Sequence, residues 1–221
     1  KKLRSLDEDM RRLLVLQHIK REGPGLFYQV AEERGLQVRV FRLDLGEALP
    51  DLIEGDLLLV LGGPMGIRDI NNPIYPWLLK EVNFIRNAIK QNYRIIGVCL
   101  GAQLLAYATG GDVQILEGGS PPKPLPEIGW SPIFSNGINK NDDLISFLNL
   151  PLNVLHWHGD RILLPKRAKI IASSKRCKEQ LFKIGPLAYG LQFHIETDDI
   201  IINRWIKEDI EFITATLGLD G

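Results

Sequence analysis

Apolar and polar positions alternate in a regular way through the first half of the chain. Stretches that are continuously apolar or alternate like strands recur at 13–16, 37–41, 56–61 and 94–98. Segments with the apolar spacing of helices separate or follow them, at 26–34, 75–91 and 100–109. Strands that are apolar throughout are buried on both faces, which is typical of a parallel sheet covered by helices. We therefore predict an α/β fold, a three-layer sandwich around a mostly parallel central sheet.

The second half of the chain is richer in short strands. We predict them at 112–116, 128–134, 153–157, 169–173, 179–184 and 187–193. Few helices separate these strands, so they should add an antiparallel or mixed portion to the sheet. The Gly/Pro-rich segment 117–126 indicates a surface loop, and a final amphipathic helix is expected over 198–216. The charged, aperiodic start predicts a tail over 1–12, followed by one domain over 13–221.

Composition narrows the classes of function. Lys+Arg and Asp+Glu both total 27, so no basic excess indicates binding to nucleic acid or to an anionic membrane. No apolar run approaches the roughly 20 residues that span a bilayer. Two cysteines cannot form a disulfide framework, and we expect a soluble, cytoplasmic protein. Neither a metal nor another cofactor is expected, because no ligand spacing or phosphate-binding loop is evident.

Cys99 lies in a sequence context that favours nucleophilic catalysis. The segment GVCLGAQ at 97–103 follows a predicted buried strand and opens a predicted helix, as in a nucleophile elbow. Gly97 and Gly101 permit the tight turn, and the helix amino terminus favours a thiolate. The N–H of Leu100 can face an oxyanion there. The alternative is a buried core cysteine.

A thiolate that carries out acyl transfer needs a base, and the base needs an acceptor that orients it. Of the four histidines, His194 lies in YGLQFHIE at 189–196, at the end of a predicted strand. In extended backbone His194 and Glu196 point to the same face, so the carboxylate can accept from one imidazole nitrogen. The other nitrogen is then free for Cys99. A surface salt bridge is the alternative for an isolated His-x-Glu.

The two segments together resemble the signature pair of class I glutamine amidotransferases, and the likeness extends from about residue 13 to 196. The resemblance implies a flavodoxin-like fold and a Cys99–His194–Glu196 triad. Cys99 would attack the side-chain amide of glutamine and form a thioester while ammonia is released. His194 would protonate the departing ammonia and later activate water, and Glu196 would orient His194.

Another segment matches the same family. LGGPMG at 61–66 is similar to the family's Gly-Pro loop, whose glycine N–H is the second oxyanion donor. By this match Gly63 takes that role and is paired with the N–H of Leu100. A plain tight turn is the alternative interpretation of the two glycines, with Gly62 as the residue that only forms the turn.

The segment HWHGD at 156–160 resembles the part of the family that approaches the amino-acid end of the substrate. This makes Gly159 and Asp160 candidate substrate contacts, whereas His158 would support the loop. Gln103 matches the elbow glutamine that hydrogen-bonds bound glutamine.

The likeness is greatest to the branch of GMP synthase glutaminases, with two departures. Ile195 replaces a frequent proline, and no synthetase domain follows Glu196 in this sequence. The resemblance therefore implies a small-molecule substrate, glutamine or a γ-glutamyl compound, and, as a possible partner, a separate synthetase subunit. The alternatives are a γ-glutamyl peptide or amine hydrolase, a catalytically quiet binding or regulatory module, and a DJ-1-like cysteine protein.

Several other residues have structural interpretations. His18 follows the first strand with Glu22 and could line a pocket, but a loop-capping role is favoured. Cys177 is expected to be an inert thiol at the surface or at a strand end, although adjacent basic residues could lower its pKa. The element EIGW at 127–130 resembles a family segment near the pocket. Three tryptophans are interpreted as core aromatics: Trp77, Trp130 and Trp205.

Overall fold

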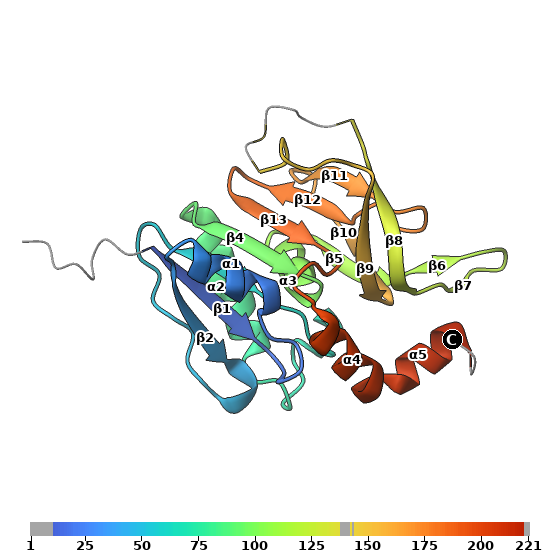
Figure 1. Cartoon of the computed structure of the whole chain (residues 1–221), viewed down its shortest axis with the longest axis horizontal. Helices are drawn as coiled ribbons and strands as arrows, with labels where there is room; N and C mark the ends of the chain where they lie inside the picture. Colours follow the sequence, from blue (N-terminus) through green and yellow to red (C-terminus); the bar gives the residue numbers. More distant parts are fainter. Residues whose placement is uncertain (1–10, 138–141, 143, 219–221) are drawn as a thin grey trace, which may run out of the picture.

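The fold is described from a computed structural model, for residues 11–137, 142 and 144–218. Within them a nine-stranded sheet has the order β2-β1-β3-β4-β13-β12-β11-β8-β9 (Figure 1). Its strands are β1 (Arg12–Gln17), β2 (Gln37–Arg42), β3 (Leu57–Val60), β4 (Arg94–Val98), β8 (Glu127–Ser135), β9 (Leu152–His158), β11 (Lys169–Ser173), β12 (Leu181–Ile184) and β13 (Ala188–Leu191). Residues 1–10 of the predicted tail lie outside the described residues, and Arg12 already belongs to β1.

The sheet has a parallel and an antiparallel part. Strands β2, β1, β3, β4 and β13 run parallel to their neighbours, and β12, β11, β8 and β9 continue the sheet in antiparallel pairs. The residues of β1 and β3 are almost all buried, which explains their unbroken apolar sequences. The predicted parallel sheet with an antiparallel extension is therefore confirmed.

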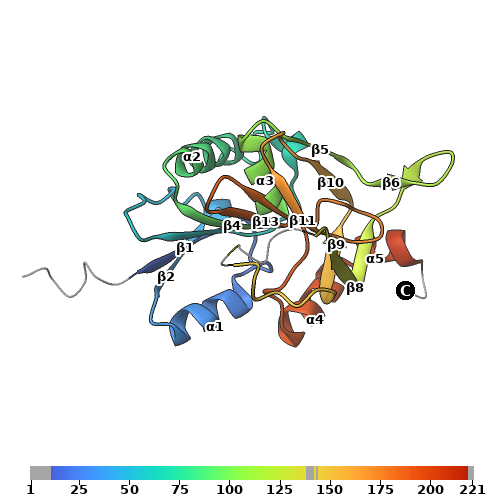
Figure 2. The same cartoon turned by 90° about the horizontal axis from the view of Figure 1, so that it is seen from above.

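Helices cover both faces of the parallel part. Figure 2 shows α1 (Gly25–Glu33) on one face and α2 (Leu78–Lys90) and α3 (Leu100–Ala108) on the other. The side chains of α2 and α3 pack against one face of β1, β3 and β4 in the largest cluster of the hydrophobic core. A smaller cluster lies between the opposite face and α1. This is the predicted three-layer α/β arrangement.

Three shorter features depart from the prediction. The segment expected as a loop contains a hairpin of β6 (Glu117–Gly118) and β7 (Lys123–Pro124), and β10 (Asp160–Leu163), which was not predicted, pairs with β5 (Asp112–Ile115). The predicted final helix is two helices, α4 (Asp199–Glu208) and α5 (Ile210–Leu217). Asp209 separates them with φ −122° and ψ 29°, outside helical geometry. Two short 3₁₀ turns complete the elements, η2 (Leu43–Leu45) and η3 (Ile67–Asp69).

The carboxyl ends of β1, β3 and β4 meet at one edge of the sheet, where α4 approaches them (Figure 1). Ligands bind at such an edge in open parallel sheets. Among the described residues, no helix has both the length and the apolar character needed to cross a membrane.

Candidate active site

Cys99 occupies the sharp turn between β4 and α3. Its backbone has φ 50° and ψ −106°, a conformation that residues with a Cβ rarely adopt. Two glycines make the turn possible because there is no room for a side chain at either one. A Cβ on Gly101 would lie 2.0 Å from the carbonyl oxygen of Val60, and one on Gly97 would lie 2.5 Å from that of Gly101. The thiol is thus held at the amino terminus of α3.

His194 and Glu196 form a buried pair. His194 Nδ1 lies 2.6 Å from Glu196 Oε1, and Glu196 Oε2 accepts from the N–H of Ile195 at 3.0 Å. Burial opposes a charge on the imidazole, but the carboxylate of Glu196 and hydrogen bonding with Cys99 outweigh it. Together they raise the pKa of His194 well above its ordinary value. Because Nδ1–H donates to Glu196, the hydrogen bond between His194 and Cys99 uses the other ring nitrogen.

The sulfur has further partners from the strands around it. Gln192 Nε2 donates to Cys99 Sγ at 3.6 Å, and the carbonyl oxygen of Trp157 lies 3.9 Å from the same sulfur. Gln103 Nε2 in turn lies 3.4 Å from Gln192 Oε1. A cavity opens above the sulfur. The residues predicted from the sequence line it, with the exception of Glu196, which lies behind the imidazole: Gly63, Cys99, Leu100, Gln103, Gly159, Asp160 and His194.

The loop that carries Gly63 is held in place by the buried His18–Glu81 ion pair. His18 Nδ1 donates to the carbonyl oxygen of Gly62 at 3.0 Å, and His18 Nε2 donates to Glu81 Oε1 at 2.8 Å. Both side chains are fully buried. Burial opposes the charge on the imidazole, but Glu81 outweighs it and the pKa of His18 is raised. In a trans peptide C=O and N–H point in opposite directions, so the N–H of Gly63 faces away from His18.

The turn after β9 is also held by side-chain contacts. His158 Nδ1 donates to the carbonyl oxygen of Asp160 at 2.8 Å, which agrees with its expected supporting role. The carboxylate of Asp160 accepts from Arg68 at 3.0 Å, and the carbonyl of Gly159 accepts from the N–H of Leu116 at 2.9 Å. Gly159 and Asp160 thereby keep a fixed position on the cavity wall.

Sequence reasoning missed several residues of the cavity wall. Glu22, Trp157, Trp205 and Asp209 all line it. Trp157 Nε1 donates to Asp209 Oδ2 at 2.8 Å, and the ring of Trp205 meets that of His194 edge-on at 4.7 Å between centroids. Burial raises the pKa of Glu22, and the nearby imidazolium of His194 only partly offsets this effect. Trp157 lies within a recognised motif, whereas the other three come from segments without one.

Two structural expectations were wrong. Cys177 is buried rather than at the surface, and burial raises the pKa of its thiol to about 12 despite the basic neighbours in sequence. It is therefore inert, as expected, but for another reason. Trp130 is 61% exposed and is not a core residue. Glu127 of the EIGW element does not line the cavity above Cys99, but it contacts His158, which does.

The comparison with known families is clear. The family model described as "Glutamine amidotransferase class-I" matches residues 26–199, which include the elbow and the His194–Glu196 pair. The chain belongs to the class I glutamine amidotransferase family. The glutamine amidotransferase-like protein YfeJ of Salmonella typhimurium is 35% identical over 181 residues, which are 81% of this chain and 73% of that protein.

Other members of the family show the same relationship. A glutamine-hydrolysing GMP synthase subunit from Ignicoccus hospitalis is 31% identical over 150 residues, 66% of this chain and 70% of that subunit. The crystal structure of a glutamine amidotransferase from Thermotoga maritima superposes with a TM-score of 0.81 at 30% identity. The match covers 94% of this chain and 86% of the solved one. The flavodoxin-like amidotransferase fold is thus confirmed, as is the relation to GMP synthase glutaminase subunits.

Proposed function

We propose that this amidotransferase domain hydrolyses the side-chain amide of glutamine, or of another γ-glutamyl compound, through a thioester on Cys99. One observation carries the proposal. A thiol at a helix amino terminus hydrogen-bonds an imidazole whose pKa is raised by a carboxylate 2.6 Å from its Nδ1. This arrangement favours a thiolate–imidazolium pair, which is the reactive form of a cysteine nucleophile.

The reaction would proceed in two halves. The Cys99 thiolate attacks the amide carbon, and a C–S bond forms as the carbonyl becomes an oxyanion. The tetrahedral species collapses, the C–N bond breaks, and the His194 imidazolium gives its proton to the departing nitrogen, which leaves as ammonia. His194 then takes a proton from water, and the oxygen of that water attacks the thioester. The C–S bond breaks and releases glutamate, with Glu196 keeping the imidazole oriented throughout.

Two backbone N–H groups are suited to the oxyanion. Leu100 is the first residue of α3, so its N–H has no acceptor within the helix. The N–H of Gly63 belongs to the peptide whose carbonyl is fixed by His18. Gln103, Gly159 and Asp160 would hold the amino-acid end of the substrate from the opposite side of the cavity.

Ammonia released in this way needs an acceptor. Some relatives are subunits of glutamine-hydrolysing GMP synthases, such as that of Ignicoccus hospitalis. We propose that the ammonia passes to a synthetase held by a separate subunit.

Covalent trapping of Cys99 tests the nucleophile without a partner. A glutamine-analogue electrophile is incubated with wild-type protein, with Cys99→Ala and with the matched control Cys177→Ala. We expect one adduct on wild type and on the control, and none on Cys99→Ala. Ammonia release from glutamine should follow the same pattern. Ammonia release that survives in Cys99→Ala would contradict the mechanism.

A second candidate, hydrolysis of γ-glutamyl amines or peptides, is favoured by the far wall of the cavity. The aromatic side chains of Trp157, Trp205 and Phe212 line it together with the charged Arg21 and Asp209. Such a wall can contact a leaving group larger than ammonia. Purified protein can be tested with glutamine and with γ-glutamyl amines. If it cleaves γ-glutamyl amines but not glutamine, hydrolysis of γ-glutamyl compounds replaces glutamine hydrolysis as the proposed function.

A further inference from the structure

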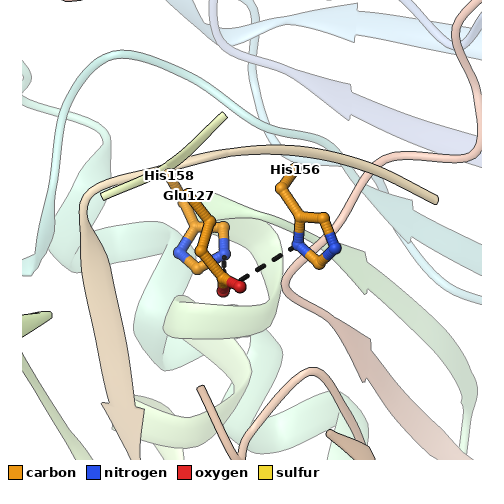
Figure 3. Close-up of side chains that lie close together, drawn as sticks. All are labelled: Glu127, His156 and His158. Atoms are coloured by element: carbon orange, nitrogen blue, oxygen red, sulfur yellow. Dashed lines mark ion pairs between the residues drawn. The ribbon is translucent and has the colours of Figure 1, made fainter. Parts of the chain in front are cut away.

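A second group of chemically active side chains lies where β8 and β9 pair, and of its members only His158 also lines the cavity above Cys99. Figure 3 shows that Glu127, His156 and His158 point toward one another. Glu127 begins β8 opposite His158, and the two histidines are two positions apart on β9, so they share a face. Glu127 Oε2 lies 3.2 Å from His158 Nε2 and 3.9 Å from His156 Nδ1. All three residues are buried.

The outer ring nitrogens identify the tautomers of both histidines. His156 Nε2 lies 3.3 Å from the carbonyl oxygen of Ser131, and His158 Nδ1 lies 2.8 Å from that of Asp160. A carbonyl oxygen can only accept, so each of these nitrogens carries a hydrogen. In the neutral imidazoles the other two nitrogens, His156 Nδ1 and His158 Nε2, then carry lone pairs. Both of these nitrogens face the carboxylate of Glu127.

Gln180 Nε2 lies 2.6 Å from Glu127 Oε2 and 3.3 Å from His158 Nε2, so its amide hydrogens can meet these two acceptors but not His156 Nδ1. A proton on His158 would satisfy the shorter contact only. It would leave His156 Nδ1, which is buried and has no hydrogen-bond partner among the described residues. A divalent ion satisfies all three groups at once.

We propose that Glu127, His156 and His158 bind a divalent first-row transition-metal ion of the zinc type. The proposal does not depend on the glutaminase reaction. Ligand atoms around tetrahedral zinc lie about 3.3 Å apart, given metal–ligand bonds of about 2.0–2.1 Å. The three candidate atoms lie within 4.8 Å of one another, so small side-chain rotations bring them to these distances.

The surroundings of the three residues are those of a metal site. Metal-binding histidines usually donate their outer N–H to a carbonyl or carboxylate, as both do here. Ser174 Oγ donates to the second carboxylate oxygen of Glu127 at 2.6 Å. The Gln180 amide lies 2.6 Å from Glu127, and its Oε1 is buried without a partner among the described residues. If the side-chain amide of Gln180 rotates by 180°, its Oε1 takes the place of its N–H₂ group. That oxygen would then be a fourth ligand to the ion.

An ion here would act on the turn that follows β9. His158 holds the carbonyl of Asp160, so an ion on His158 Nε2 would fix the strand end that continues into the cavity wall. A separate cavity, lined by Glu127 and His156 but not by Cys99, gives an ion access.

Zinc titration of the full chain tests the site. The Cys99→Ala background removes the thiolate, which could itself bind zinc beside His194. We expect one zinc ion per chain in competition with a chromophoric chelator. His156→Gln should lower the affinity at least about 100-fold while far-ultraviolet circular dichroism stays unchanged. The matched control Cys177→Ala should bind zinc like the parent protein.

Cobalt substitution tests the ligands independently of any ligand variant. Co²⁺ bound to the Cys99→Ala protein should give visible d–d bands without a thiolate charge-transfer band. The proposal is overturned if no zinc binds, if zinc binds equally to His156→Gln, or if a thiolate band appears. If His156→Gln does not fold, the cobalt spectrum decides. Because the protein lacks Cys99, none of these results bears on the proposed hydrolysis.

Discussion

Replacement of the buried His18–Glu81 pair should separate catalytic positioning from stability. His18 fixes the carbonyl of Gly62, and so it should also fix the N–H of Gly63 that we expect to face the oxyanion. Three variants are compared with the wild-type protein: His18→Leu, Glu81→Met and the double replacement. Each new side chain is apolar and close in volume to the one that it replaces.

The expected free energies of unfolding follow from the burial of the pair. His18→Leu leaves the Glu81 carboxylate buried without a cation, which costs about 3–5 kcal/mol. Glu81→Met leaves a neutral His18 with one unpaired ring nitrogen, which costs about 1–3 kcal/mol. The double variant lacks the whole pair, and a buried ion pair replaced by apolar residues is close to neutral. Its cost is therefore mainly the unpaired carbonyl of Gly62, about 1–3 kcal/mol.

Activity should follow a different order. Glu81→Met keeps the donor to Gly62 and should retain most of kcat. His18→Leu and the double variant lack that donor, so kcat should fall in both. Loss of one oxyanion donor costs up to about 10²–10³-fold in kcat, and KM should change little. The stability of the double variant thus recovers relative to His18→Leu, whereas its kcat does not.

Urea unfolding and steady-state ammonia release measure the two quantities, and trapping of Cys99 by a glutamine-analogue electrophile replaces the second assay if basal turnover is low. A double variant with wild-type kcat would refute the positioning role. A double variant as unstable as His18→Leu would refute the account of the ion pair.

Three further outcomes are expected. Gly101→Ala should destabilise the fold by about 3 kcal/mol or more, because its Cβ would overlap a backbone carbonyl at the end of β3, as urea unfolding can show. A thiol reagent should label Cys99 in the native protein and Cys177 only after unfolding, since the pKa of Cys177 is raised to about 12. Glu196→Gln should lower the pKa of His194 in an NMR titration. The raised pKa stabilises the folded protein below the unfolded value, and this contribution disappears as pH rises through the folded pKa, so Glu196→Gln should flatten that loss.

Much of the fold could be predicted because its signals are local. The buried strands β1, β3 and β4 are apolar on both faces, and that pattern is visible in any short window. The insertion of β13 between β4 and β12 depends on contacts between distant segments, which no window contains. The break at Asp209 has the same origin. The helical spacing of apolar residues continues through this position, but the carboxylate of Asp209 accepts a hydrogen bond from Trp157 on β9. This tertiary contact lies where α4 ends.

Some residues of the candidate site could likewise be predicted from the sequence, and others could not. Cys99, His194 and Glu196 lie in motifs whose chemistry requires a fixed spacing, so their juxtaposition could be expected. Trp205 reaches the same cavity from α4, and nothing in its own neighbourhood indicates it. In the loop after β1 a pocket-lining role was considered for His18, but Glu22 is the residue that lines the cavity. The mutual arrangement of Glu127 and the β9 histidines was also hidden, because the pairing register of β8 and β9 creates it.

The backbone of Cys99 has a consequence for how this sequence can change over time. A residue with a Cβ at φ 50° and ψ −106° costs about 1–3 kcal/mol that glycine would largely avoid. Selection for stability alone would therefore favour glycine at this position, and only selection for the thiol opposes it. A lineage released from the proposed reaction should lose its cysteine early and become more stable as it does so. Cys99→Gly should accordingly unfold at a higher urea concentration than the wild-type protein.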